Sequence, residues 1–359
     1  MNPAEEATDP LQEVLGQLRQ AGKLDSSGSF TLDLNKSLDK LSQFQLEDPR
    51  RYVHYLVAAA YAKGATFIQF EVGPRDVLAC FDGESFSHHD LVNLFHTLFE
   101  SSQSRAGRAA NHLAFALNVT RQIGAQFVAF DTFGESEGSR LQLTSGLLQV
   151  APLAKKPWSE ARITNRFHLH EPIDPDFLKR VAEGVGRRLS GSSRSWPEHE
   201  FLVNGRCGFC PVQIWVNGQL IKPPLDAVLE CWVGDDLQLR PPSVPSSIPV
   251  KEQAFCGGVG LCREHFGCIF WVVDGVAFRD VMERTLPKEI AFWIYSDLLK
   301  TDVSRQYLVQ GPELLELRRR VFEIAPQVLP QLQSELRENP RAVKKYTGFA
   351  QATLAGGKV

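Results

Sequence analysis

The order of the predicted strands and helices between residues 29 and 150 constrains the fold of this chain more than any other feature of its sequence. After a short strand and two helices, the alternating segments TFIQFEV and DVLACF predict a β-hairpin. Two more helices follow, the second of which covers AANHLAFALNVTRQI and is expected to stop at Gly124. QFVAFDT, RLQLTSG and LLQVAPL then predict three further strands. Because strands and helices mix without strict βαβ alternation, we expect the α+β class: a two-layer α/β sandwich with helices on one face of an antiparallel or mixed sheet.

Helix-capping residues mark the ends of two of these helices. Asp48 and Pro49 have the residue types of the N-cap and N1 positions of the second helix, and Gly64 is suited to end it. Ser87 and Asp90 have the spacing of a capping box directly before the apolar run LVNLFHTLF. The third helix is therefore expected to begin there.

Changes in composition divide the chain into segments. We expect a flexible leader over residues 1–28, a first domain over 29–150, a second α/β domain over 151–335 and a tail over 336–359. The boundary is placed at residues 151–160, which are rich in proline and lysine, with a hinge between the two domains.

The second domain carries its own strand and turn signals. It is expected to begin with the strand ITNRFHLHE and the helix FLKRVAEGVGRRL. Asn217-Gly218 predicts a tight hairpin turn, residues 240–249 predict an extended loop, and CIFWVV and VAFRDV are expected to meet at a turn near Asp274-Gly275. EIAFWIYS predicts a buried segment, and ELLELRRRVFEIA a terminal helix.

The charge and the cysteine content limit the cellular compartment and the kinds of partner that are expected. The 39 basic and 42 acidic residues of the 359-residue chain give a net charge of −3, so no general attraction to nucleic acid or anionic lipid is expected. No apolar run is long enough to span a bilayer, and the acidic N-terminus does not resemble a secretory signal. The odd number of cysteines, 7, argues against a disulfide framework. These features predict a cytoplasmic protein with free thiols and no membrane partner.

The segment YLVAAAYAKGATFIQFEV resembles the nucleotide-pocket segment of the GHKL ATPases, which include MutL and HtpG. In that family a glutamate and an asparagine four residues later share one helix face, where they orient the attacking water and hold Mg²⁺. The matching positions here are Tyr55 and Ala59. The resemblance therefore implies the scaffold of the site without its chemistry.

The adenine-binding motif of the same family is also altered. The family's strand ends in Asp-x-Gly-x-Gly, whose aspartate accepts a hydrogen bond from the adenine amino group. The ungapped match places Phe81 at that aspartate and retains only Gly83 of the glycines. Asp82 lies one place along the strand, which turns its side chain to the other face, so it is not expected to take over the role.

The phosphate-binding lid of the family is represented by GRAANHLAFALNVTRQIGAQFVAF. This segment keeps the hydrophobic pattern but has only Gly107 before the helix, where the family is glycine-rich. Arg105 and Arg108 are candidates for contact with an anion there, although solvated surface arginines are the expected interpretation.

The second domain resembles the middle domain of the HtpG (ninety-kilodalton heat-shock) chaperones, over the stretch from IFWVVDGVAFRDV to ELLELRRRV. In that family a loop arginine reaches the γ-phosphate of ATP, and Asp302-Val303-Ser304-Arg305 keeps it as Arg305. We expect Arg305 to be either a phosphate sensor or a structural arginine bound to a carboxylate or to helix-terminal carbonyls. The resemblance covers residues 29–325 and leaves out the family's dimerisation domain, so a monomer is expected.

Two sets of residues have metal-binding side chains but are not expected to bind a metal. One is a zinc pattern whose spacings are wider than usual: Cys207, Cys210, Cys256, Cys262, His265 and Cys268. The glycine-rich CGGVGLC within it is expected to be a flexible turn. His168 and His170 share one face of a strand and are expected to be surface or edge residues without carboxylate companions.

Three functional hypotheses follow from the resemblance. The first is an HtpG-like protein-interaction or chaperone-like module, with a protein client or partner and weak or no ATP hydrolysis, in which Tyr55, Ala59 and Phe81 fill a vacant site. The second is a working ATPase that binds ATP and Mg²⁺ through non-standard residues, with Arg305 sensing phosphate. The third is a MutL- or gyrase-like nucleic-acid factor, which the acidic balance and the lack of a basic stripe disfavour.

Overall fold

All of the described residues lie between residues 39 and 359. The computed structural model describes residues 49–338, except for 74, 100–103, 145–146, 172–204, 223–224, 234–255, 263–266, 283–285, 287–288, 297–298 and 303–304. The predicted leader, the helix FLKRVAEGVGRRL, the loop at 240–249 and the tail beyond residue 338 lie outside the described residues.

A mixed eight-stranded sheet forms the first layer of the fold, with the strand order β5-β4-β3-β6-β2-β1-β7-β8. The β1–β7 pair is parallel, and every other neighbouring pair is antiparallel. The strands are β1 (Phe67–Val72), β2 (Asp76–Phe81), β3 (Phe127–Phe133), β4 (Gly138–Thr144), β5 (Leu147–Leu153), β6 (Asn165–His170), β7 (Gln213–Val216) and β8 (Gln219–Leu220).

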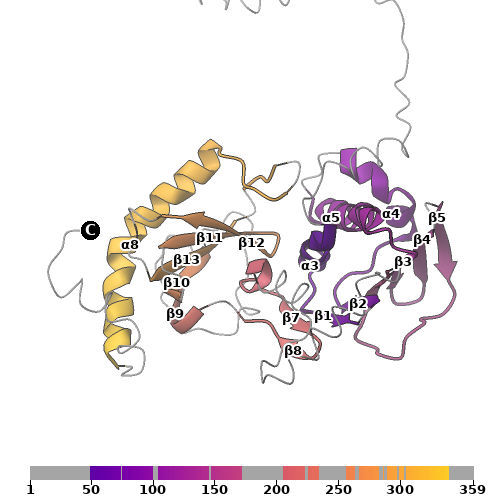
Figure 1. Ribbon diagram of the computed structural model, residues 1–359, viewed down its shortest axis with the longest axis horizontal. Helices are drawn as coiled ribbons and strands as arrows, with labels where there is room; N and C mark the ends of the chain where they lie inside the picture. The colour runs from indigo at the N-terminus through magenta and orange to yellow at the C-terminus, as the bar shows by residue number, and fades with distance from the viewer. Residues whose placement is uncertain are drawn as a thin grey trace, which may run out of the picture. The chain divides into compact units, whose positions relative to one another are not determined.

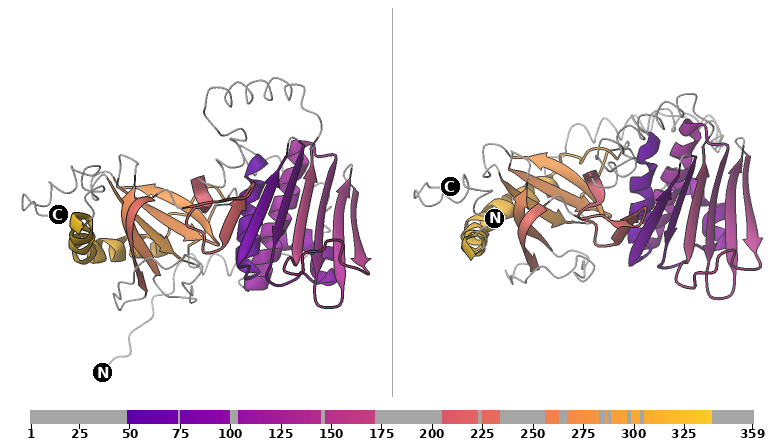
Figure 2. Two further views of the ribbon diagram at one scale, coloured as in Figure 1. Left: turned by 90° about the horizontal axis from the view of Figure 1, so that it is seen from below. Right: turned by 60° about the horizontal axis from the view of Figure 1, so that its bottom comes forward.

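Helices cover one face of this sheet (Figure 2). They are η1 (Pro49–Arg51), α3 (Tyr52–Ala62), α4 (His88–Val92), η2 (Leu94–Phe99), α5 (Arg105–Thr120) and η3 (Arg121–Ile123). Aromatic side chains from α3 and from the inward positions of the strands fill the space between the layers, and the fully buried ones include Tyr52, Phe70, Phe81, Phe130 and Phe167. The α+β class and the two-layer arrangement are therefore confirmed.

The predicted helix ends are confirmed, with shifts of a few residues. Ser87 and Asp90 form the predicted capping box, but α4 ends at Val92 and a 3₁₀ helix follows. Gly64 and Gly124 adopt the left-handed conformation at the expected helix ends, with φ of 69° and 68°. Pro49 begins a 3₁₀ turn, and the α-helix proper starts at Tyr52.

The predicted boundary at residues 150–151 divides the first sheet. ITNRFHLHE, expected to open the second domain, forms β6 and lies between β2 and β3 in the middle of the first sheet. Its alternate residues Asn165, Phe167 and Leu169 are buried toward the helices. β7 and β8, from residues 213–220, extend the same sheet beyond β1. Pairing between strands that are distant in the sequence decides where β6, β7 and β8 lie. The local composition of the chain does not indicate that pairing.

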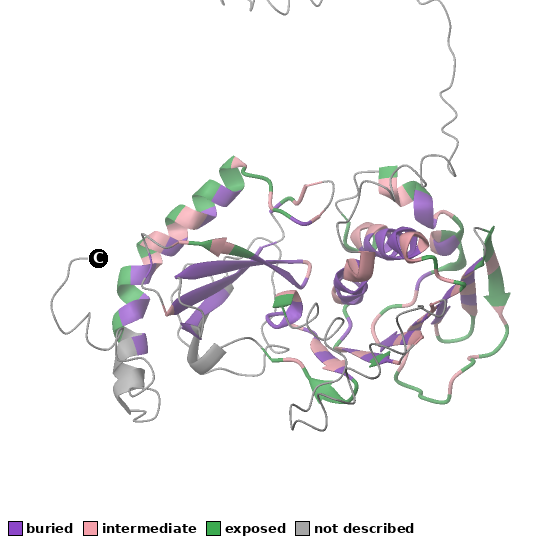
Figure 3. Cartoon of the chain, in the orientation of Figure 1, coloured by how far each residue is buried: buried purple, intermediate pink, exposed green. Residues whose placement is uncertain are grey.

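A second, five-stranded sheet has the order β12-β11-β13-β10-β9 (Figure 1). Its strands are β9 (Leu225–Val233), β10 (Cys256–Cys262), β11 (Cys268–Val273), β12 (Val276–Val281) and β13 (Ile290–Tyr295), and α8 (Pro312–Glu338) follows them. The side chains of β11 and β13 are buried throughout (Figure 3). Arg318 of α8 donates through Nε to Asp280 Oδ2 of β12 at 2.7 Å, which ties the helix to this sheet.

The segment CGGVGLC is a strand and not the flexible turn that its glycines suggested. It pairs with β13 on one side and with β9 on the other. A Cβ atom on Gly257 would overlap the backbone carbonyl of Trp293, so the glycine permits a close approach of the neighbouring strand. Tail residues 336–338 likewise belong to α8, which runs to Glu338.

Within the described residues, no helix combines the length and the apolar character needed to cross a membrane.

Candidate functional site

The two altered helix positions of the nucleotide motif are both buried in α3. Ala59 is completely buried and Tyr55 is 6% exposed. The Tyr55 ring stacks on Phe115 of α5, with centroids 5.6 Å apart. Burial raises the pKa of the Tyr55 hydroxyl to about 12, although the positive charge of Arg305 acts in the opposite direction. Tyr55 therefore stays a neutral phenol at physiological pH.

The residues of the altered adenine motif are also engaged in packing and hydrogen bonds within the fold. Phe81 ends β2, is completely buried and contacts Phe130, with ring centroids 6.3 Å apart. Asp82 accepts hydrogen bonds from the Thr66 backbone amide at 2.7 Å and the Thr66 hydroxyl at 2.5 Å, so its carboxylate holds the start of β1. Gly83 has a φ of 94°, which favours glycine.

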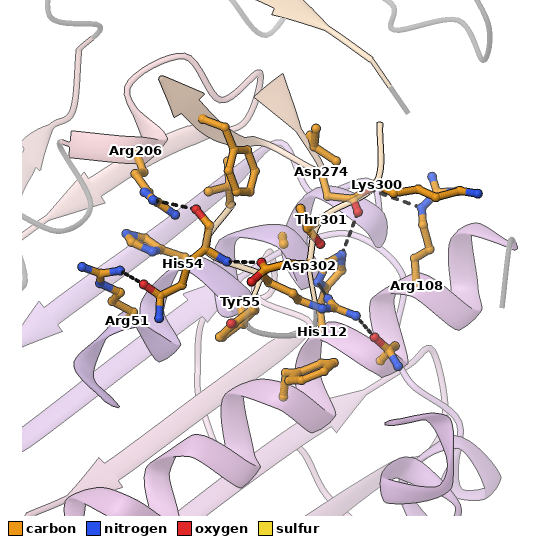
Figure 4. A pocket seen from close by; sticks show the side chains of 18 of the residues that line it. Arg51, His54, Tyr55, Arg108, His112, Arg206, Asp274, Lys300, Thr301 and Asp302 are labelled. Atoms are coloured by element: carbon orange, nitrogen blue, oxygen red, sulfur yellow. Dashed lines mark hydrogen bonds and ion pairs between the residues drawn. The ribbon is translucent and has the colours of Figure 1, made fainter. Parts of the chain in front are cut away.

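A pocket with a volume of about 600 Å³ is lined by residues of α3 and α5, among others (Figure 4). Tyr55, Arg108 and Arg305 line it together, although they are far apart in the sequence. Ala59 and residues 81–83 do not line it. The remaining lining comes from further residues of α3 and α5, from η1 and η2, from the segment before β7, from the β11–β12 hairpin, and from residues 299–306.

Arg305 enters the pocket from a tightly closed loop. Thr301 and Leu308 pair at the base of the loop, and Asp302 Oδ1 accepts hydrogen bonds from the backbone amides of Gln306 and Tyr307 at 2.9 and 3.1 Å. Arg305 itself has a φ of 52°, an uncommon conformation for a non-glycine residue. The loop therefore presents Arg305 in one defined direction.

The guanidinium group of Arg305 is bonded to α5. Its Nη2 donates to the side-chain oxygen of Asn111, and its Nη1 donates to His112 Nδ1 at 2.5 Å. The group also lies over the Phe115 ring, 4.0 Å from the centroid. Burial lowers the pKa of Arg305, although an arginine remains a cation under any such shift. Of the two roles expected for Arg305, these contacts favour the structural one, with side-chain partners in place of a carboxylate.

His112 joins Arg305 to the carboxylate of Asp274. Because Arg305 can only donate, His112 Nδ1 is the acceptor and the ring proton lies on Nε2, which donates to Asp274 Oδ2 at 2.8 Å. Burial first, and then the charge of Arg305, lower the pKa of His112. Burial alone would raise the pKa of Asp274, but His112 and Arg108 outweigh it and lower that pKa. The result is a neutral histidine between a cation and an anion.

Arg108 is not the solvated surface residue that the sequence suggested. Its Nε lies 3.3 Å from Asp274 Oδ1, and its side chain is 25% exposed. Asp274 belongs to the turn between β11 and β12, so the partner of Arg108 comes from a strand pair 166 residues later, and its position was not predictable from local pattern.

Two further arginines line the pocket and were missed by the sequence reasoning. Arg51 donates through Nη1 to the Gln306 side-chain oxygen at 2.5 Å, and Arg206 donates through Nη2 to the Gln306 backbone oxygen at 3.0 Å. Nothing in the local sequence around either arginine distinguishes it from a surface residue. Their common partner on the Arg305 loop appears only in the folded chain.

His168 and His170 have the carboxylate companion that the sequence did not reveal. Both ring systems bond Asp76 Oδ1, at 2.9 and 2.8 Å, across the β2–β6 pair. The side chain of Asp76 is 50% exposed, so this cluster lies at the surface of the sheet. The two histidines lower the pKa of Asp76 through hydrogen bonds.

The cysteines proposed for zinc are divided between described and undescribed side chains. Cys207, Cys210 and Cys268 are buried free thiols. Burial raises the pKa of Cys210 to about 12, which keeps its thiol protonated. The side chains of Cys256 and Cys262, and the whole of His265, lie outside the described residues. Among the residues that are described, no group of three or more His, Cys, Asp or Glu side chains has the arrangement of a metal site.

Comparison with known proteins finds similarity to solved structures, but none to family models or curated sequences. No family model matches the chain, and no curated protein sequence matches it. Among solved structures, the chain is similar to the B subunit of the DNA gyrase from Myxococcus xanthus, with a TM-score of 0.45 and 11% sequence identity. The match covers 82% of this chain and 95% of that chain. At this TM-score and identity, the likeness does not establish a shared fold, activity or partner.

Proposed function

We propose that this chain is a GHKL-type protein related to the HtpG chaperones that does not hydrolyse ATP and acts as a protein-interaction or chaperone-like module. The observation that carries the proposal is the complete burial of Phe81 at the position where the family reads adenine. A phenyl ring there cannot accept a hydrogen bond from the adenine amino group. It also occupies volume against Phe130 in a close-packed interior.

The other replacements act in the same direction. Ala59 has no oxygen with which to hold Mg²⁺, and Tyr55 is a neutral phenol stacked on Phe115 in place of a carboxylate that orients water. Asp82 does not compensate, because its carboxylate already accepts hydrogen bonds from Thr66. Binding and hydrolysis of ATP are therefore expected to fail for separate physical reasons.

Arg305 has a structural role in this proposal. A phosphate sensor needs guanidinium donors directed at the ligand, whereas the donors of Arg305 bond Asn111 and His112. The competing function, an ATPase with non-standard residues, draws support from the gathering of Tyr55, Arg108 and Arg305 around one pocket.

Calorimetric titration of the full chain with Mg-ATP, together with a steady-state hydrolysis assay, separates the two functions. We expect no saturable binding in the micromolar range and no turnover above background. A low-micromolar dissociation constant with turnover that Arg305→Met abolishes would establish the ATPase instead. Losing one charge-assisted hydrogen bond to adenine alone costs about 1.5–3 kcal/mol, or one to two decades of affinity.

The protein-partner half of the proposal needs its own experiment. Crosslinking of the full chain in its native cells, followed by purification under denaturing conditions, should recover defined protein partners that are insensitive to added ATP. Salt-sensitive recovery of nucleic acid in place of protein would favour the MutL- or gyrase-like alternative.

A further inference from the structure

Two guanidinium groups share one hydrogen-bonding residue at the edge of the pocket. Arg51 and Arg206 bond the side-chain and backbone oxygens of Gln306, at 2.5 and 3.0 Å. Arg206 also lies over the Phe278 ring, 5.2 Å from its centroid. Figure 4 shows both arginines on the same side of the pocket. Two like charges are thus held near each other by a neutral residue.

Neither arginine has a carboxylate partner among the described residues. The two carboxylates that line the pocket serve other groups: Asp274 bonds His112 and Arg108, and Asp302 accepts from backbone amides of its own loop. Lys300 adds a further, exposed cation to the lining. Five arginine and lysine side chains therefore line the pocket against two aspartates.

This arrangement carries an electrostatic cost. Burial, and then the neighbouring charge of Arg51, lower the pKa of Arg206, which means that its cation is held in an unfavourable environment. An anion between the two guanidinium groups would remove the repulsion and use their remaining N–H donors. The planar donor forks of arginine suit the oxygens of a phosphate group.

We propose that this pocket binds a small phosphate monoester, with its phosphate group on Arg51 and Arg206. The body of the ligand faces the apolar part of the lining, which Val276, Phe278 and Leu299 supply. A volume of about 600 Å³ lies within the range of about 300–1,000 Å³ that small-molecule sites occupy.

Of the ATP positions of the GHKL resemblance, Tyr55 lines this pocket, whereas Ala59 and residues 81–83 do not. The proposed phosphate contacts are made by Arg51 and Arg206, which are not among those positions. The site also does not require Arg305, whose donors bond Asn111 and His112. Turnover of Mg-ATP would overturn the proposed function, whereas the phosphate site is tested by binding of phenyl phosphate. The two proposals therefore fail in different assays.

Calorimetric titration of the full chain with phenyl phosphate at pH 7.5 and low ionic strength tests the site. Inorganic phosphate and phenol serve as the two halves of the probe. We expect saturable binding of phenyl phosphate, weaker binding of inorganic phosphate and none of phenol. The double variant Arg51→Gln, Arg206→Gln should weaken binding of phenyl phosphate at least about tenfold.

Arg319→Gln is the matched control, because it removes the same charge from the exposed face of α8, where Arg319 pairs with Glu316 and Glu323. It should leave affinity unchanged. Absence of saturable binding to the wild-type chain would overturn the proposal, as would equal affinities in the double variant and the wild type. If the double variant does not fold, Arg51→Gln and Arg206→Lys decide separately: unchanged affinity in both refutes the site, and loss in either supports it.

Discussion

At the scale of single residues, His112 has the most demanding position in the pocket. It is buried, accepts from Arg305 on one ring nitrogen and donates to Asp274 from the other. A protonated ring would place a second donor against the Arg305 guanidinium, so only the neutral ring satisfies both contacts. The charge state of one imidazole is thereby linked to the contact between the Arg305 loop and α5.

This link predicts a dependence of stability on pH. The pKa of His112 is lowered in the fold from its reference of 6.5, so the unfolded chain binds the proton more tightly. The stabilising contribution is complete above pH 6.5 and is lost as the pH falls toward the folded pKa. Within that window, the free energy of unfolding should drop by about 1.4 kcal/mol per pH unit because of this residue.

The measurement compares urea unfolding of the wild type and His112→Gln at pH 7.5, 6.5 and 5.5. Glutamine keeps an acceptor and a donor but does not titrate, so the variant should be nearly as stable at pH 7.5 and lose less stability on acidification. Parallel stability curves for the two proteins would show that His112 does not titrate with folding.

At the scale of elements, Gly83 controls how β2 ends beneath the C-terminus of α3. Its φ of 94° is unfavourable for other residues. A Cβ atom at this position would lie 2.6 Å from the Lys63 carbonyl oxygen and 2.9 Å from the Ala65 amide nitrogen. Both of these atoms belong to the backbone, so neither can move aside as the end of a flexible side chain could.

Gly83→Ala should lower the free energy of unfolding by about 3 kcal/mol or more, because backbone strain and overlap add. Gly124→Ala provides the control: its φ is also positive, at 68°, but nothing lies within 4 Å of the added Cβ. That variant should cost only about 1–2 kcal/mol. Thermal and urea unfolding measure both, and equal costs would contradict the predicted overlap.

At the scale of the whole molecule, the pocket depends on contacts between residues that are distant in the chain. The Arg305–Asn111 hydrogen bond spans 194 residues, and the Arg51–Gln306 bond spans 255. Both reach the same loop, whose base pairs Thr301 with Leu308. The loop is consequently held by helices that belong to the first half of the sequence.

A double-mutant cycle on Arg305→Met and Asn111→Ala measures this connection. Because the two side chains bond directly in a part-buried position, the coupling energy should be about 1 kcal/mol or more. Arg318→Met with Asn111→Ala is the control cycle, since Arg318 instead bonds Asp280. Additivity within about 0.5 kcal/mol in the first cycle would show that the loop and α5 are not energetically linked.

Sequence alone determined the features that adjacent residues decide. Asn217-Gly218 and Asp274-Gly275 were predicted as turns, and all four residues have positive φ, a conformation that these residue types tolerate. The capping box of Ser87 and Asp90, the β1–β2 hairpin and the buried strand β13 follow in the same way. Such features depend on backbone preferences and on local periodicity, which the sequence carries directly.

Only the tertiary structure decided which distant segments meet. β6 lies between β2 and β3, and β1 pairs in parallel with β7, although the sequence placed β6 and β7 beyond a domain boundary. Arg51, Arg206 and Gln306 likewise come together from three separate segments. Many alternative pairings satisfy the same local pattern, and the choice among them depends on packing and electrostatic contacts that form only when the whole chain folds.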